Sequence, residues 1–135
     1  MDQPANVVLS VSTVTGDTVR NKKGEDLGWI EEIMIDLDSG RVAYAVLSSG
    51  GFLGMGDRLH AIPWNALAVD LEQREFVLDI EKERLERAPG FDKDNWPRMA
   101  DRQWGEIIHR YYGSKPYWDA TAAAREPSRQ FNNIT

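Results

Sequence analysis

The side chains with the greatest capacity for chemistry are carboxylates that lie close together in the sequence. Glu31 and Glu32 are adjacent, and Asp36 and Asp38 follow shortly after them. Carboxylates that share a site shift one another's pKa, which suits general acid–base catalysis or proton transfer. The surrounding alternation of apolar and polar residues favours solvent-exposed strand faces instead. A small hydrolase or a proton-handling protein that uses these clustered carboxylates is therefore an alternative hypothesis, ranked second among the alternatives to a non-enzymatic protein.

Sequence segments that resemble metal or phosphate sites each lack a residue that the chemistry needs. The pairs Asp36/Asp38 and Asp92/Asp94 resemble the opening of a calcium-binding loop, but the next ligand position holds no oxygen-bearing side chain in either case. The glycine-rich segment 50–56 leads into a β-prone segment, whereas a phosphate-binding loop opens a helix. The chain has no cysteine, which excludes a zinc–thiolate site. We therefore predict no metal ion and no cofactor.

The chain contains two histidines, His60 and His109. No nucleophile-elbow motif accompanies either of them, so a Ser-His-Asp arrangement has no support from the sequence. His60 falls in a β-prone segment. His109 falls in the last turn of a predicted helix, where the helix dipole favours a cation. We predict structural roles for both, no catalytic residues, and a protein that is not an enzyme.

Length and charge narrow the class of protein. The chain has 135 residues, 16 Lys and Arg, 22 Asp and Glu and a formal net charge of -6. This size suits one compact core, and the negative charge disfavours contact with DNA phosphates. No apolar run approaches the ~20 residues that cross a bilayer, and residues 1–6 lack the basic and apolar segments of a secretory signal. We therefore expect a cytoplasmic protein with no membrane insertion and no direct DNA binding.

Turns rich in glycine and polar residues divide the first two-thirds of the chain into short β-prone segments. These segments cover residues 17–21, 33–38, 41–47, 59–64, 66–69 and 76–80. Their close spacing predicts a mainly β fold, a small antiparallel β-barrel of about six strands. A closed barrel of this size is filled by its own side chains, so only its outer surface is left for function.

The second β-prone segment alternates apolar and polar residues, which predicts one buried and one exposed face. Ile33, Ile35 and Leu37 share the face that we expect to be buried. Ile30 lies an odd number of residues before Ile33, so both point inward only if an extra residue shifts the register. The sequence therefore predicts a β-bulge near residues 31–32.

Two helices are predicted in the last third of the chain. A short charged helix over 81–87 ends at Pro89 and Gly90. A longer amphipathic helix over about 101–112 begins at Asp101, a good N-cap residue, and ends before Gly113. Its apolar residues follow helical spacing and predict one buried face, made of Trp104, Ile107, Ile108, Tyr111 and Tyr112.

Two groups of apolar side chains are candidates for contact with another protein. One group forms the tip of the glycine-rich loop and has no periodicity that returns it to the core. The other group comprises aromatic residues, at the end of the fourth β-prone segment and at the start of the C-terminal tail. The predicted interface residues are Phe52, Leu53, Met55, Trp64, Tyr117 and Trp118.

The order of several short motifs resembles that of the PRC-barrel domain family. The motifs are TGD (15–17), GEDLG (24–28), IEEIMID (30–36), SGRVAYAVL (39–47) and AIPW (61–64). The family takes its name from the cytoplasmic domain of the photosynthetic reaction-centre H subunit, and a related barrel ends a bacterial ribosome-maturation factor. The stretch PGFDKDNWP (89–97) resembles an extension found in stand-alone bacterial members. We accordingly divide the chain into a barrel domain, 14–88, and a C-terminal extension, 89–135.

The resemblance implies a strongly bent barrel that is often dimeric, serves as an assembly module and has no catalytic residues. We therefore expect a bacterial homodimer that binds another protein of unknown identity. The first alternative is a ribosome-maturation or RNA-processing accessory protein, which would contact a basic ribosomal protein because the chain itself is acidic.

Overall fold

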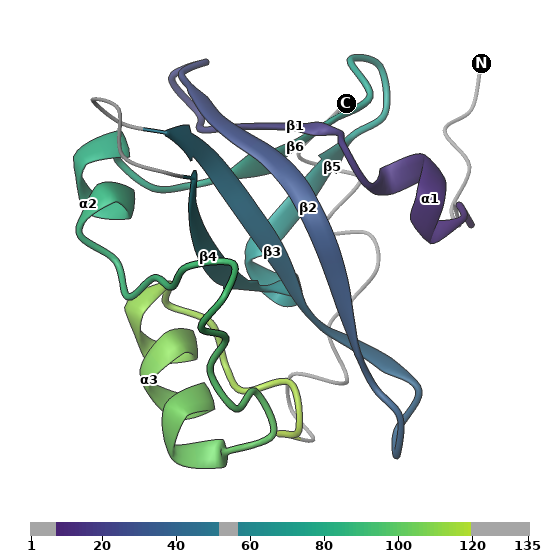
Figure 1. Ribbon diagram of the computed structural model, residues 1–135. Helices are drawn as coiled ribbons and strands as arrows, with labels where there is room; N and C mark the ends of the chain where they lie inside the picture. The colour runs from purple at the N-terminus through teal and green to yellow at the C-terminus, as the bar shows by residue number, and fades with distance from the viewer. Residues whose placement is uncertain (1–7, 52–56, 120–135) are drawn as a thin grey trace.

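The computed structural model describes residues 8–51 and 57–119 of the chain. In this part, a strongly curled sheet is flanked by three short helices (Figure 1). The elements are α1 (Val11–Val14), β1 (Thr18–Arg20), β2 (Asp26–Asp36), β3 (Arg41–Gly51), β4 (Asp57–Pro63), the 3-10 turn η1 (Trp64–Ala66), β5 (Leu67–Asp70), β6 (Glu75–Leu78), α2 (Lys82–Glu86) and α3 (Arg102–Tyr111). The mainly β fold class, with a short helix and a longer one near the C-terminus, is confirmed.

The sheet curls because its two end strands are consecutive in the chain. The strand order is β4-β3-β2-β1-β6-β5. A flat sheet would separate its outer strands by five spacings, about 24 Å, whereas the η1 connection reaches at most ~14 Å when extended. The result is a half-barrel. The predicted six-stranded barrel-like sheet is confirmed, with β4 and β5 at the two ends of its strand order. One pairing differs from the predicted antiparallel arrangement, because β1 pairs with β6 in parallel.

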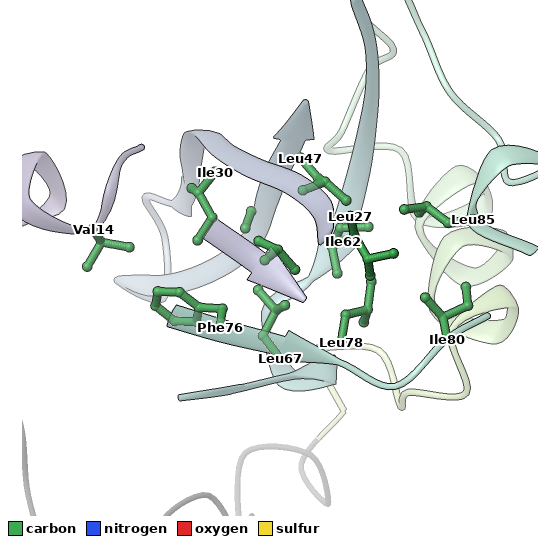
Figure 2. Close-up of a cluster of buried hydrophobic side chains, with 12 residues drawn as sticks. Val14, Leu27, Ile30, Leu47, Ile62, Leu67, Phe76, Leu78, Ile80 and Leu85 are labelled. Atoms are coloured by element: carbon green, nitrogen blue, oxygen red, sulfur yellow. The ribbon is translucent and has the colours of Figure 1, made fainter. Parts of the chain in front are cut away.

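The inside of the curl is filled with aliphatic and aromatic side chains (Figure 2). Val14 from α1 lies at one end of this cluster, and Leu85 from α2 lies at the other. The buried members are Val14, Val19, Leu27, Ile30, Ala45, Leu47, Ile62, Leu67, Phe76, Leu78, Ile80 and Leu85. The sheet's concave interior is therefore packed by the chain's own residues, as we expected.

The predicted inward-facing side of β2 is correct only as far as Ile33. The predicted bulge is confirmed, since the β2–β3 register shifts between Ile30 and Glu32. A second shift lies between Met34 and Ile35. Beyond it the predicted inward face was wrong: the exposed fraction is 48% for Ile35 and 90% for Leu37. Both residues lie on the β2–β3 hairpin, which projects away from the rest of the sheet (Figure 1).

Helix α3 packs on the outer face of the sheet, against β3 and β4. The Asp101 carboxylate caps it by accepting a hydrogen bond from the Gln103 N–H, as predicted. A second cluster at this contact comprises the buried residues Ala43, Tyr44, Ala61 and Ile108. The predicted buried face was wrong at one position, because Ile107 is 53% exposed. Gly105 lies on the buried face of the helix instead, next to the Tyr44 side chain of β3.

Candidate interaction surface and the C-terminal strap

Residues 114–119 follow α3, and we call them the C-terminal strap. The strap folds back over α3 and the β2–β3 hairpin, where the main-chain N–H and carbonyl of Tyr117 bond to the side chains of His109 and Arg41. The Tyr117 N–H donates to His109 Nε2 at 3.2 Å. The Tyr117 carbonyl oxygen accepts a bond from Arg41 Nη1 at 2.8 Å. The strap therefore joins the C-terminal extension to the sheet.

Aromatic packing adds to these bonds. The Tyr117 ring meets the Tyr44 ring edge-on, with ring centres 5.8 Å apart. The Trp118 ring lies 5.6 Å from the His109 ring and passes close above Gly105. The Arg102 guanidinium lies 5.2 Å from the Trp118 ring, a cation–π contact. The close approach of the Trp118 ring to α3 leaves no room for a side chain at position 105, which explains the glycine there.

His109 is buried, and the predicted helix-terminal cation was wrong. Its Nδ1–H donates to the Gly105 carbonyl oxygen at 2.7 Å, so Nε2 is the acceptor nitrogen of a neutral ring. Burial lowers the pKa of this imidazole below its ordinary range, since a charge there would lose its hydration. His109 therefore connects α3 to the strap through its hydrogen bonds.

His60 lies in β4, the strand location that we predicted, and it too is buried. Its Nδ1 lies 3.2 Å from the Pro89 carbonyl oxygen, which links β4 to the start of the C-terminal extension. Burial lowers the pKa of this ring as well. Beside it, the Leu59 and Phe91 main chains exchange two hydrogen bonds, which cover part of the outer edge of β4.

The carboxylates that lie close together in the sequence are mainly surface and turn residues. Glu31, Glu32 and Asp38 are exposed, as expected for solvated strand faces. Asp36 is partly buried and shapes the hairpin turn: its carboxylate accepts a bond from the Asp38 N–H and its carbonyl oxygen one from the Gly40 N–H. Within the described ranges, no three His, Asp or Glu side chains cluster as a metal site would require.

An open groove of about 510 Å³ runs between the β1–β2 hairpin and α2. Ionisable residues line it, and the fold itself engages two of them. The Asp26 carboxylate accepts a bond from the Gly28 N–H at 2.9 Å, and His60 contacts the Pro89 carbonyl oxygen. The groove opens to the surface beneath α2, and Leu27 and Leu85 of the packed interior form part of its wall.

The six predicted interface residues divide into three locations. Phe52, Leu53 and Met55 lie outside the described residues. Trp64 is half-buried, with its ring 5.8 Å from that of Phe76, and packs against the interior cluster. Tyr117 and Trp118 pack within the chain through the strap. The interface role of all six stays a prediction.

Several apolar side chains that were not predicted to be exposed lie at the surface of the structure. At the hairpin these are Ile35 and Leu37, and near α1 they are Val8, Leu9 and Val11. The position of Leu37 next to the Asp-Ser-Gly turn was the available signal, because side chains beside a tight turn have few neighbours. In the described part of the chain, none of the helices has the length and apolar character needed to span a membrane.

Comparison with known proteins places this fold. No curated protein sequence matches the chain. One similar solved structure is that of a Pseudomonas aeruginosa protein, RimM, provisionally assigned to 16S ribosomal RNA processing. The identity is 19%, the match covers 56% of this chain and 45% of the other, and the TM-score is 0.38. The PRC-barrel domain profile matches residues 6–85, more than half of the sequence, and the chain therefore belongs to the PRC-barrel domain family.

Proposed function

We propose that the protein is a non-enzymatic interaction module that acts as a homodimer and uses the outer surface of its half-barrel to bind another protein. Membership of the PRC-barrel family and the interior filled by aliphatic side chains support this proposal. A filled interior leaves the exterior for binding. The negative charge of the chain favours a partner with basic residues over a nucleic acid.

The observation that carries the proposal is the pair of exposed aliphatic residues on the β2–β3 hairpin. Ile35 and Leu37 are both large and apolar, and they project from the body of the fold among acidic neighbours. Apolar side chains surrounded by polar ones are the usual composition of a binding surface. A dimer contact through this hairpin would bury them.

The test is a comparison of self-association between two variants, each of which replaces one exposed aliphatic side chain. Leu37→Ser removes the most exposed aliphatic residue of the hairpin, and Ile107→Ser removes one of similar chemistry from the outer face of α3. Burying one leucine contributes about 1.5–3 kcal/mol, so Leu37→Ser weakens the dimer about tenfold or more in sedimentation equilibrium. Ile107→Ser leaves the dissociation constant unchanged. An unchanged dissociation constant in Leu37→Ser would remove the hairpin from the interface.

The two alternatives remain predictions. A ribosome-associated accessory role predicts salt-sensitive co-purification with small ribosomal subunits, and its absence at low salt would remove that hypothesis. A carboxylate-dependent hydrolase or proton-handling role requires ionisable groups that converge on a shared pocket. The exposed positions of Glu31, Glu32 and Asp38 give that role no support.

A further inference from the structure

His109 binds the strap in a way that depends on its being neutral. Both ring nitrogens are engaged, Nδ1 as donor to the Gly105 carbonyl at 2.7 Å and Nε2 as acceptor from the Tyr117 N–H at 3.2 Å. The first bond stays within α3, whereas the second spans α3 and the strap. A proton on Nε2 would place two N–H donors against each other. The strap bond and a protonated ring are therefore mutually exclusive.

The surroundings of His109 offer little compensation for a positive charge. The neighbouring rings are Tyr44 from β3 and Tyr117 and Trp118 from the strap, with centres 5.4, 6.0 and 5.6 Å away. The charged groups of the strap region contact the strap itself: Arg102 lies over the Trp118 ring, Asp36 interacts with the Tyr117 hydroxyl, and Arg41 donates to the Tyr117 carbonyl oxygen. No carboxylate forms an ion pair with His109 within the described ranges.

We propose that the strap is a pH-sensitive latch, released from α3 and β3 when His109 takes up a proton. Release would uncover the imidazole and the Gly105 surface on which Trp118 rests. The device is independent of the proposed dimer, because it needs only contacts within one chain. Its immediate consequence is that mild acid exposes an aromatic and apolar part of the α3–β3 surface.

The direction and size of the effect follow from proton linkage. In the released state His109 regains its ordinary pKa of 6.5, whereas burial lowers the pKa in the docked state. The released state therefore binds more protons, so docking is fully favoured above that pH and is lost as the pH falls below it. From about pH 7.5 to about pH 5.5, docking weakens about tenfold if the docked ring stays neutral.

Hydrogen exchange of the Tyr117 amide in the full chain measures this equilibrium. The protection factor, which corrects for the intrinsic pH dependence of exchange, is expected to fall about tenfold between the two pH values. Main-chain amides at the centre of β3 are expected to keep theirs. In His109→Gln the side-chain amide oxygen can accept a hydrogen bond from the Tyr117 N–H, but the glutamine does not titrate in this pH range. The protection factor of the Tyr117 amide is therefore expected to stay constant in this variant. Arg110→Gln alters an exposed basic neighbour on the same helix and should behave like wild type.

Three results would overturn the proposal. One is constant Tyr117 protection in the wild-type chain, and another is an equal loss in His109→Gln, which would assign the effect to a different group. If His109→Gln fails to fold, nitrogen-15 spectra of the wild-type imidazole decide the matter. They should show a neutral Nδ1–H ring at neutral pH and protonation in step with Tyr117 exchange. Protonation of His109 without any change at Tyr117 would contradict the latch.

Discussion

The substitution Gly105→Ala lies at the centre of the contact between the strap and α3. It is expected to change the free energy of unfolding through two opposing contributions. A methyl group at this position would lie 2.8 Å from Trp118 Cη2, 2.9 Å from the Tyr44 hydroxyl oxygen and 3.0 Å from Trp118 Cζ3. Each distance is shorter than a relaxed contact between these atoms. Tyr44 is 0% exposed and closely packed, so its hydroxyl has little room to move away from the added methyl group.

The expected free-energy change is the difference between helix propensity and steric crowding. Replacing glycine by alanine inside a helix gains about 1 kcal/mol. Forcing an extra methyl into packed surroundings costs about 1–3 kcal/mol. We therefore expect Gly105→Ala to lower the free energy of unfolding by about 1 kcal/mol, although the same substitution stabilises an exposed helix.

A double-mutant cycle with Trp118→Ala assigns the cost to the strap. Removing the indole eliminates two of the three close contacts, so Gly105→Ala in that background becomes neutral or stabilising. The coupling between the two sites is then about 1–2 kcal/mol, measured by urea unfolding of the four proteins. Stabilisation of the wild-type chain by Gly105→Ala, or a coupling near zero, would refute the packing of Trp118 on α3.

Four further substitutions test the fold. Ile30→Ala removes a side chain that is 1% exposed and should cost about 2–5 kcal/mol in urea unfolding; Ile35→Ala should cost less than about 1 kcal/mol, and equal costs would contradict the second register shift of β2. Gly28 has φ +131°, and an added methyl would lie 2.0 Å from the Ser48 carbonyl oxygen, so Gly28→Ala should abolish the cooperative unfolding transition; a Tm near that of wild type would contradict this close approach. Asp101→Ala removes the N-cap of α3 and should cost about 1 kcal/mol in thermal unfolding, whereas an unchanged Tm would show that the cap contributes nothing.

Features of the fold that depend on residues close together in the sequence could be predicted from residue types and spacing alone. The bulge at residues 31–32 follows from the spacing of Ile30 and Ile33, and the start of α3 follows from Asp101. The second register shift has no such signal. It depends on how β2 meets β3 across the hairpin, so the exposure of Ile35 could be learned only from the pairing.

The candidate site was less predictable because it depends on tertiary contacts. The sequence places His109 at a helix end, where a cation is favourable. The strap then covers that end and buries the ring, and burial disfavours the charge. The glycine at position 105 gave a weaker signal, since a glycine inside an amphipathic helix often marks a close approach of another element.

The proposed function is that of a homodimer that binds another protein through the outer surface of its half-barrel. Light scattering of the full chain over a wide range of concentrations tests it most directly. The expected result is twice the mass of the chain at high concentration, with dissociation on dilution. A mass of one chain at every concentration would contradict the homodimer.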